Sequence, residues 1–399
     1  MNARVLVLDA NQRSALAITR SLGRRPGITV LTADTTPRAL AGASRFSSGY
    51  RQYPCPAENP GAFIDWLAAT VDREAITHLF PATEVSSYTC LKHRDRLGAC
   101  KLPFADLETV QQLADKCRLM TLAEELGIPH PPSQRIENSQ SVDPTQLGPY
   151  PLVLKPCFSQ IWVNETWLGS SVHVAESPDD FRRLTQTRPY LRDHPFLVQG
   201  FIPGNGAGVF ALYRNGQAVA FFAHRRLREK PPTGGVSTLS ESAAPDPRLL
   251  DLARRLLDRA QWHGVAMVEF RVTPAGEPYL MEVNPRFWGS LQLAIDCGID
   301  FPRLLFELSE GCTPAVPTHY PTGRRLRWLL GDLDSLYLYL RDRDQYRTRE
   351  KLARILAFLR PGFGRTRHEV NRLGDLGPAR FELMQYLRDL LRSRQRTGA

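Results

Sequence analysis

Two stretches near the middle of the chain, residues 265–272 and 279–286, carry carboxylates at matching positions. They flank a four-residue turn, and pairing symmetric about that turn predicts a hairpin in which Glu269 faces Glu282. Carboxylates directly across a β ladder repel each other, so a cation between them is expected. With Asn284 they make a hard-oxygen set suited to Mg²⁺, which fills its other positions with phosphate oxygens and water. The alternative is a surface hairpin whose acidic groups are satisfied by neighbouring arginines.

The other face of the same hairpin fixes its register. The alternation of side chains along the two strands predicts that this second face is apolar and buried. On the first face, Asn284 is expected opposite Met267. Arg286 follows Asn284 by two residues and can reach the same phosphate. The apolar face is formed by Val268, Phe270, Val272, Tyr279, Met281 and Val283.

Three further signals are weaker when taken alone. Lys155 ends a short apolar strand and Lys116 begins a helix; an ammonium group is a good partner for nucleotide phosphates, although a lysine at a strand end is common. The apolar strand within residues 197–204 ends in a Gly- and Pro-rich segment that can offer backbone groups to a flat heterocycle, or simply form a turn.

A cationic segment, residues 222–229, is a candidate for further substrate contacts. Strand alternation predicts that His224, Arg226 and Arg228 share one face, which suits an anionic substrate; the alternative is a solvated edge strand. The remaining candidate substrate contacts are Arg13, Glu84 and Ser290.

The elements that position these residues follow from the apolar patterns. Residues 1–105 alternate strand and helix signals, which predicts a parallel sheet with helices outside it. No G-x-G-x-x-G motif is present, so dinucleotide binding is not supported. Residues 106–127 have a helical pattern, residues 151–283 have more strand character with a hairpin at Asn215-Gly216, and the pattern is helical after about residue 320.

Length and composition limit the number of domains and the class of protein. A chain of 399 residues that is 42% hydrophobic and 23% charged is typical of two or three globular domains. No apolar run approaches the ~20 residues of a membrane span, and the first strand is too short for a signal peptide. Seven cysteines without a C-x-x-C pair favour reduced thiols in a cytoplasmic protein and give no zinc framework.

The net charge of +10 belongs to the end of the chain. Residues 321–399 contain 18 Lys and Arg against 9 Asp and Glu, which leaves +1 for residues 1–320. Such a region can contact an acidic partner, a membrane surface or nucleic acid, but a solvated helical appendage is the favoured interpretation.

In this order the elements resemble the ATP-grasp superfamily, and in particular its carboxylate–amine ligase branch, beside carbamoyl phosphate synthase-like proteins. The resemblance covers about residues 1–315 and is most specific at Glu269 and at Glu282-Val283-Asn284-Pro285-Arg286. It implies an α/β then α+β chain. Its parts are a pre-ATP-grasp parallel-sheet domain (1–110), two ATP-grasp subdomains (111–195 and 196–318) and a basic helical C-terminal region (319–399).

The resemblance also implies roles for individual residues. Lys116 and Lys155 contact ATP phosphates, and Glu269, Glu282 and Asn284 bind Mg²⁺. Arg286, Arg226 and Lys155 are the catalytic group around the transferred phosphoryl group. Two departures stand out: residues 157–168 replace the small glycine-rich lid, and no carboxylate follows residues 199–202 to hold the ribose. The implied adenine-side contacts are Gln199, Gly200, Phe201, Ile202 and Met281.

The implied function is an ATP-dependent ligase that activates a carboxylate as an acyl phosphate and joins it to an amine. ATP and Mg²⁺ are the expected cofactors, with two ions and Mn²⁺ as a substitute. Small-molecule acid and amine substrates, a homodimer and an acidic partner for the C-terminal region are expected, and DNA is not. The altered lid motivates an alternative, an ATP-binding regulatory or assembly subunit without ligase turnover. Nucleic-acid binding through the C-terminal region is disfavoured because residues 1–320 are nearly neutral.

Overall fold

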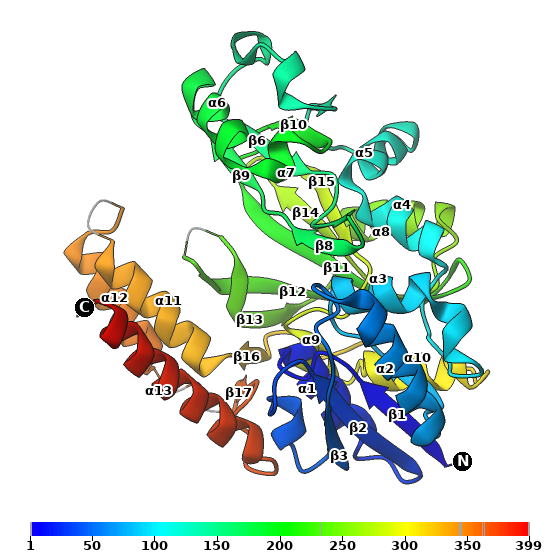
Figure 1. Ribbon diagram of the computed structural model, residues 1–399. Coiled ribbons are helices and arrows are strands. Elements are labelled where there is room, and N and C mark those ends of the chain that lie inside the picture. Colours follow the sequence, from blue (N-terminus) through cyan, green and yellow to red (C-terminus); the bar gives the residue numbers. More distant parts are fainter. Residues whose placement is uncertain (1, 233, 343–344, 361, 363, 398–399) are drawn as a thin grey trace.

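The computed structural model describes residues 2–232, 234–342, 345–360, 362 and 364–397 (Figure 1). The chain begins with a four-stranded parallel sheet, as the alternation of strand and helix signals predicts. The sheet places β1 between β2 and β4, so the loops after these strands meet at one edge. In spatial order its strands are β3 (Gly49–Gln52), β2 (Ile28–Asp34), β1 (Ala3–Val7) and β4 (His78–Phe80).

Helices cover this sheet, and two of them start at capping residues. Asn59 accepts a hydrogen bond from the Ala62 amide ahead of α2, and Thr83 accepts one from the Ser86 amide ahead of α3. The second cap places Glu84 in the first turn of α3, beside the carboxyl end of β4. The helices are α1 (Arg13–Leu22), α2 (Pro60–Arg73) and α3 (Glu84–Lys92), with short 3₁₀ turns at η1 (Ala41–Ala43) and η2 (Arg94–Leu97).

The helix predicted over residues 106–127 is two helices, α4 (Leu107–Ala114) and α5 (Lys116–Glu125). Asp115 leaves the helical conformation, with ψ of 107°, and its carboxylate accepts the amides of Cys117 and Arg118. The break therefore makes Lys116 the first residue of α5.

A small antiparallel sheet follows, with its own apolar core around Leu154, Phe181 and Phe196. Its order is β5 (Ser133–Ile136), β10 (Phe196–Gly200), β6 (Leu152–Pro156) and β9 (His173–Ala175). A separate hairpin, β7 (Gln160–Val163) and β8 (Thr166–Gly169), follows β6. The unit also contains η3 (Ser139–Ser141), η4 (Pro144–Gln146), α6 (Pro178–Thr187) and α7 (Pro189–Arg192).

The largest sheet has seven strands and carries most of the candidate residues. Its order is β15 (Pro278–Asn284), β14 (Gly264–Val272), β11 (Asn205–Arg214), β12 (Gln217–Lys230), β13 (Val236–Ala243), β16 (Arg325–Arg327) and β17 (Thr366–His368). The predicted Asn215-Gly216 turn joins β11 to β12. The helices α8 (Pro247–Arg259), α9 (Leu291–Asp296) and α10 (Phe301–Ser309) accompany it.

The C-terminal region is more than the favoured helical appendage. Besides α11 (Leu329–Arg341), α12 (Thr348–Leu359) and α13 (Gly377–Thr397), it supplies β16 and β17 to the large sheet. Figure 1 shows the three helices as one layer at the end of the β12–β13 hairpin. The region is thus built into the sheet. No helix within the described residues combines the length and apolarity that a membrane crossing requires.

One prediction about the cysteines is wrong. Cys117 and Cys157 are joined by a disulfide, and five cysteines are free. The two segments meet because the Lys116 amide donates to the Cys157 carbonyl at 2.8 Å, which brings the two Cα atoms to 5.2 Å.

Candidate nucleotide and metal site

The carboxylate pair lies as the residue pattern predicts. In the β14–β15 ladder Glu269 pairs with Glu282, and Met267 pairs with Asn284. Because paired residues share a face of the sheet, the two carboxylates and the amide lie on the same side. The Asn284 amide nitrogen donates to Glu282 Oε1 at 3.1 Å. The hairpin therefore presents three oxygen-bearing side chains together.

The buried face departs from the prediction by one residue. The register shifts between Glu269 and Phe270, so that Leu280 rather than Met281 lies opposite Phe270. Leu280 is fully buried, whereas the Met281 sulfur lies 3.6 Å from Lys155 Nζ. The bulge releases Met281 from the buried face toward Lys155.

The two candidate phosphate lysines come from different elements and converge on Glu282. Lys116 Nζ lies 3.7 Å from a Glu282 oxygen and donates to Ser159 Oγ at 3.1 Å. Lys155, on β6, is close enough to Glu282 for the carboxylate to favour its charged form. Both ammonium groups therefore lie near the Glu282 carboxylate, Lys116 from α5 and Lys155 from β6.

Burial controls the charge of these groups. It lowers the pKa of Lys155 to about 8, against the opposing attraction of Glu282. Burial also raises the pKa of Glu269, with Arg226 acting in the other direction. For Glu282 burial again opposes the charged form, but Lys116, the hydrogen bond from Asn284, Lys155 and Arg286 outweigh it and lower the pKa. Glu282 is thus held ionised by surrounding cations.

Two arginines complete the charged group. Arg226 Nη2 lies 2.9 Å from a Glu269 oxygen, and Arg226 Nη1 lies 3.3 Å from a Glu229 oxygen. Arg286 donates to Asn284 Oδ1 at 3.2 Å, and its Nε lies 3.6 Å from Glu84 at the start of α3. Through this last contact the parallel-sheet domain reaches the end of the hairpin. The structure brings together Lys116, Lys155, Arg226, Glu269, Met281, Glu282, Asn284, Arg286 and Glu84.

The predicted adenine segment continues from β10. Gln199 is buried, and its amide nitrogen donates to Ser133 Oγ at 2.7 Å, while its Oε1 has no hydrogen-bond partner among the described residues. The Gly200 amide donates to the Pro132 carbonyl at 3.1 Å. Phe201 is 43% exposed and Ile202 is half-buried in the irregular segment that follows. This segment joins the small sheet to the large one.

His224 and Arg226 share a face as predicted, but only Arg226 is charged there, and Arg228 lies on the other face. His224 Nε2 lies 2.7 Å from Ser290 Oγ, and burial lowers the pKa of this histidine to about 3. A register shift between Arg226 and Arg228 turns Arg228 away, and it pairs with Asp332 of α11 at 2.7 Å. Arg228 is therefore outside this group of residues because β12 contains a bulge.

Arg13 lies on a neighbouring cavity. It pairs with the buried Glu369, and its guanidinium lies 4.1 Å from the centre of the Trp328 ring. It also lies against Gly289, three residues beyond Arg286: a methyl group added at Gly289 would come within 3.1 Å of Arg13 Nη2. The cavity, of about 430 Å³, is also lined by Glu382 on α13. Arg13 thus connects the hairpin end to the C-terminal region.

Sequence reasoning missed Ser159, Ser133 and Glu229, which are partners of Lys116, Gln199 and Arg226. Ser159 lies inside the atypical segment that replaces the glycine-rich lid, so its position marked it as unusual but not as a lysine partner. The serines have no pattern of their own, because their roles follow from which strands become neighbours.

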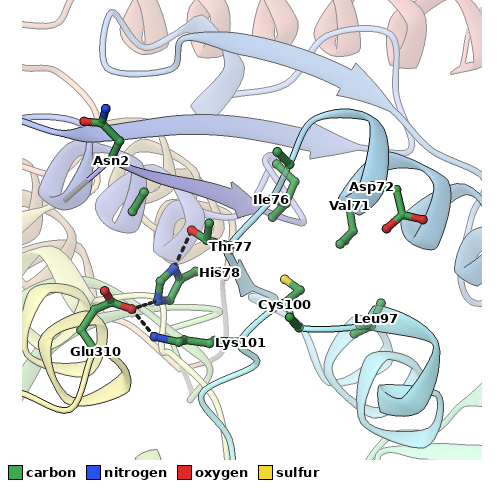
Figure 2. A pocket seen from close by; sticks show the side chains of 13 residues that line it. Asn2, Val71, Asp72, Ile76, Thr77, His78, Leu97, Cys100, Lys101 and Glu310 are labelled. Atoms are coloured by element: carbon green, nitrogen blue, oxygen red, sulfur yellow. Dashed lines mark hydrogen bonds and ion pairs between the residues drawn. The ribbon is translucent and has the colours of Figure 1, made fainter.

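A second cavity, of about 450 Å³, opens at the opposite end of the parallel sheet, near the amino ends of β1 and β4 (Figure 2). Three of its titratable groups form a cluster. Glu310 pairs with Lys101 and lies 3.1 Å from His78 Nε2, and the Thr77 hydroxyl lies 2.8 Å from His78 Nδ1. Ligands of such sheets bind at the carboxyl ends of the strands. This cavity is therefore not the candidate site.

Comparison with known proteins agrees with the geometry. Residues 192–331 match a family model described as "ATP-grasp in the biosynthetic pathway with Ter operon". No curated protein matches the chain in sequence.

Solved structures match over most of the chain. L-amino acid ligase from Bacillus licheniformis is 17% identical, with a TM-score of 0.59 over 77% of this chain and 74% of that one. Biotin carboxylase from Campylobacter jejuni is 16% identical, with a TM-score of 0.61 over 80% and 74%. The biotin carboxylase domain of Hydrogenobacter thermophilus 2-oxoglutarate carboxylase, solved with MgADP and bicarbonate, is 11% identical, with a TM-score of 0.62 over 81% and 73%.

At these low sequence identities the similarity to solved structures supports the fold alone. The family match covers the strands that carry Arg226, Glu269 and Glu282. The predicted resemblance is confirmed: the chain has the ATP-grasp fold.

Proposed function

We propose that this protein is an ATP- and magnesium-dependent ligase that joins a small-molecule carboxylic acid to an amine. The observation that carries the proposal is the pairing of Glu269 with Glu282, with Asn284 and Arg286 beside them and two lysines facing them. The ligases and carboxylases among the structural neighbours support the same class of reaction.

The donor set fits Mg²⁺. Two carboxylates and an amide oxygen lie on one face of the hairpin, and such hard oxygens are the ligands that Mg²⁺ prefers. Glu282 keeps its charge through its cationic neighbours, so it is available as a ligand at neutral pH. Glu269, Glu282 and Asn284 would hold the metal, either two Mg²⁺ ions or Mn²⁺ in their place, and it would neutralise charge on the phosphate oxygens.

The proposed reaction has two steps. An oxygen of the substrate carboxylate attacks the γ-phosphorus of ATP, the bond to the bridging oxygen breaks, and ADP leaves. The amine nitrogen then attacks the acyl phosphate carbon, inorganic phosphate leaves, and the nitrogen loses a proton to form the amide.

The chain's own residues serve these steps through charge. Lys116 and Lys155 hold the phosphates, and Arg286, fixed by Asn284 and Glu84, faces the transferred group. Arg226, on β12 of the same sheet, compensates the negative charge of Glu269. Gln199, Gly200, Phe201, Ile202 and Met281 are proposed for the adenine side, and Arg13, Glu84, His224 and Ser290 for the substrate side.

The test is ADP release by the full chain with Mg-ATP and mixtures of acids and amines, with products identified by mass spectrometry. Glu282→Gln is expected to lower the rate by ~10²-fold or more, because it removes a charged oxygen ligand. Glu277→Gln, an exposed position in the turn of the same hairpin, is the matched control and should keep the rate.

The alternative is an ATP-binding subunit without turnover, which the atypical lid segment favours. ATP binding with no ADP release from any acid–amine pair would select this alternative. Loss of turnover in both variants would show only that the hairpin had been disturbed, and circular dichroism of each variant separates that case.

A further inference from the structure

The largest of the described cavities lies away from the nucleotide site. It has a volume of about 650 Å³ and is lined by β12, β13, β16, β17 and the end of α12. Five arginines and a histidine surround it: Arg228, Arg325, Arg327, Arg360, Arg365 and His368. Among the described residues that line it there is no carboxylate, although Arg325 pairs with Glu241 at 2.7 Å.

Strand register places this cavity on the other face of the large sheet. Glu269 is aligned through Gly208 and His224 with Ser242, so these four share the face of the metal-type carboxylates. Arg228 and Arg327 are both paired with Leu239. Leu239 is an odd number of positions from Ser242 along β13, so it and its two partners lie on the opposite face of the sheet. The two sites therefore share β12 but no side chain.

The arginines beside the cavity exceed their counter-charges. Asp332 is fully buried and accepts Arg228 and Arg327 at 2.7 Å and Arg354 at 2.8 Å. These arginine side chains are only 16%, 12% and 11% exposed, so three largely buried positive charges share one negative charge. Burial, with repulsion from neighbouring arginines, lowers the pKa of Arg228 to about 10. Concentrated positive charge in a poorly solvated place favours an anion.

Several polar atoms around the cavity also lack partners in the described part of the chain. Arg327 Nη2, Arg354 Nη1 and His368 Nδ1 are buried and lack hydrogen-bond partners within the described part of the chain. Arg360 and Arg365 are exposed, and among the described residues neither forms an ion pair. Buried polar groups without a partner are uncommon in native proteins and call for an explanation.

We propose that this cavity binds a soluble small molecule that carries two or more phosphate groups. Guanidinium groups bind phosphate through two parallel hydrogen bonds, which suits arginine better than lysine. A cavity of this volume lies within the ~300–1,000 Å³ of small-molecule sites. Its concave shape, with donors from strands and a helix around it, favours a compact polyanion over an extended nucleic acid or acidic peptide.

The experiment is calorimetric titration of the full chain with inorganic pyrophosphate and tripolyphosphate, carried out in the Lys155→Gln background. That background weakens the nucleotide site, so its result does not depend on the proposed ligase activity. One binding event is expected, weakening with salt. The Arg360→Gln/Arg365→Gln double variant should bind at least ~10-fold more weakly. Both positions are exposed, so the variant should fold normally.

The control removes the same charge elsewhere. Arg349→Gln/Arg388→Gln changes two exposed arginines of α12 and α13 outside the cavity and should bind like its parent. Equal weakening in both double variants, or no heat with either phosphate compound, overturns the proposal. Binding of an aspartate-rich peptide but not of pyrophosphate overturns it as well, and assigns the surface to an acidic protein.

Discussion

Burial and the proposed phosphate binding have opposite effects on the charge of Lys155. Its ammonium lies in a place where burial lowers its pKa to about 8, yet phosphate binding requires the charged form. In the unfolded chain a lysine titrates near 10.4. Between these values the unfolded chain binds more protons, so the stability of the ligand-free protein rises with pH across that window. Below about pH 8 the buried charge is a constant cost.

The first prediction follows from this conflict. Lys155→Met should raise the free energy of unfolding at pH 7 by on the order of 1–3 kcal/mol and weaken Mg-ATP binding by ~10-fold or more. Urea denaturation and calorimetric titration measure the two effects. Lys351→Met on α12 is the control. Unchanged ATP affinity in Lys155→Met would remove this lysine from the phosphate site.

Residue patterns predicted some neighbours and not others. The pairing of Glu269 with Glu282 follows from alternation around one short turn, which is local information. Met281 and Arg228 escaped the same rule because each lies next to a bulge that shifts the alternation by one residue. Nothing in a local pattern distinguishes a regular strand from a bulged one here.

At the scale of elements, the β7–β8 hairpin stands where a glycine-rich lid was expected. It is attached to the parallel-sheet domain through Trp167, whose indole nitrogen donates to Thr89 Oγ1 and whose amide donates to the Ala57 carbonyl, both at 3.1 Å. The Trp167 ring also packs against Tyr88. Ser159, the partner of Lys116, directly precedes this hairpin, so its position depends on the same attachment.

Removal of the attachment should release the hairpin. Trp167→Leu is expected to speed amide hydrogen exchange of residues 160–169 by ~10-fold or more, because the indole hydrogen bond to Thr89 and the ring contact with Tyr88, both on α3, are lost. Hydrogen exchange with mass spectrometry measures this, and Thr166→Ala, an exposed neighbour, is the control. Equal exchange in Trp167→Leu and the parent would mean that other contacts hold the hairpin.

The disulfide joins the residue after Lys116 to the second residue after Lys155. Cysteine count and spacing favoured free thiols, because pairing over 40 residues depends on the meeting of α5 with the end of β6. Alkylation of the denatured, unreduced protein should therefore label five cysteines, and seven after reduction. Intact mass measures both numbers. Seven labels before reduction would show that the bond does not form in the isolated protein.

At the scale of the whole molecule, the C-terminal region holds the parallel-sheet domain as well as the large sheet. Arg20 of α1 is 1% exposed and donates to Asp375, 2.8 Å away, and to the carbonyls of Glu369 and Val370. Asp375 also accepts Ser44 Oγ at 2.7 Å. The charge count located the excess of positive charge in this region. It did not reveal that charged side chains such as Asp375 are buried there, because their burial depends on tertiary packing.

Loss of this buried pair should be costly. Asp375→Asn is expected to lower the free energy of unfolding by about 3–5 kcal/mol, because it leaves Arg20 charged and without its counter-ion. Urea denaturation measures the change. Asp389→Asn, on the exposed part of α13, is the control and should stay within ~0.5 kcal/mol of the parent. A similar small change for Asp375→Asn would mean that the carbonyl groups alone satisfy Arg20.

The Arg20–Asp375 contact spans 355 positions of the chain. During synthesis α1 leaves the ribosome long before Asp375 is made, so the Arg20 guanidinium lacks this counter-ion until residue 375 has been added. The packing around α1 is therefore completed only when residues 369–375 have been made, and a nascent chain halted before that point leaves the buried Arg20 side chain without its partners.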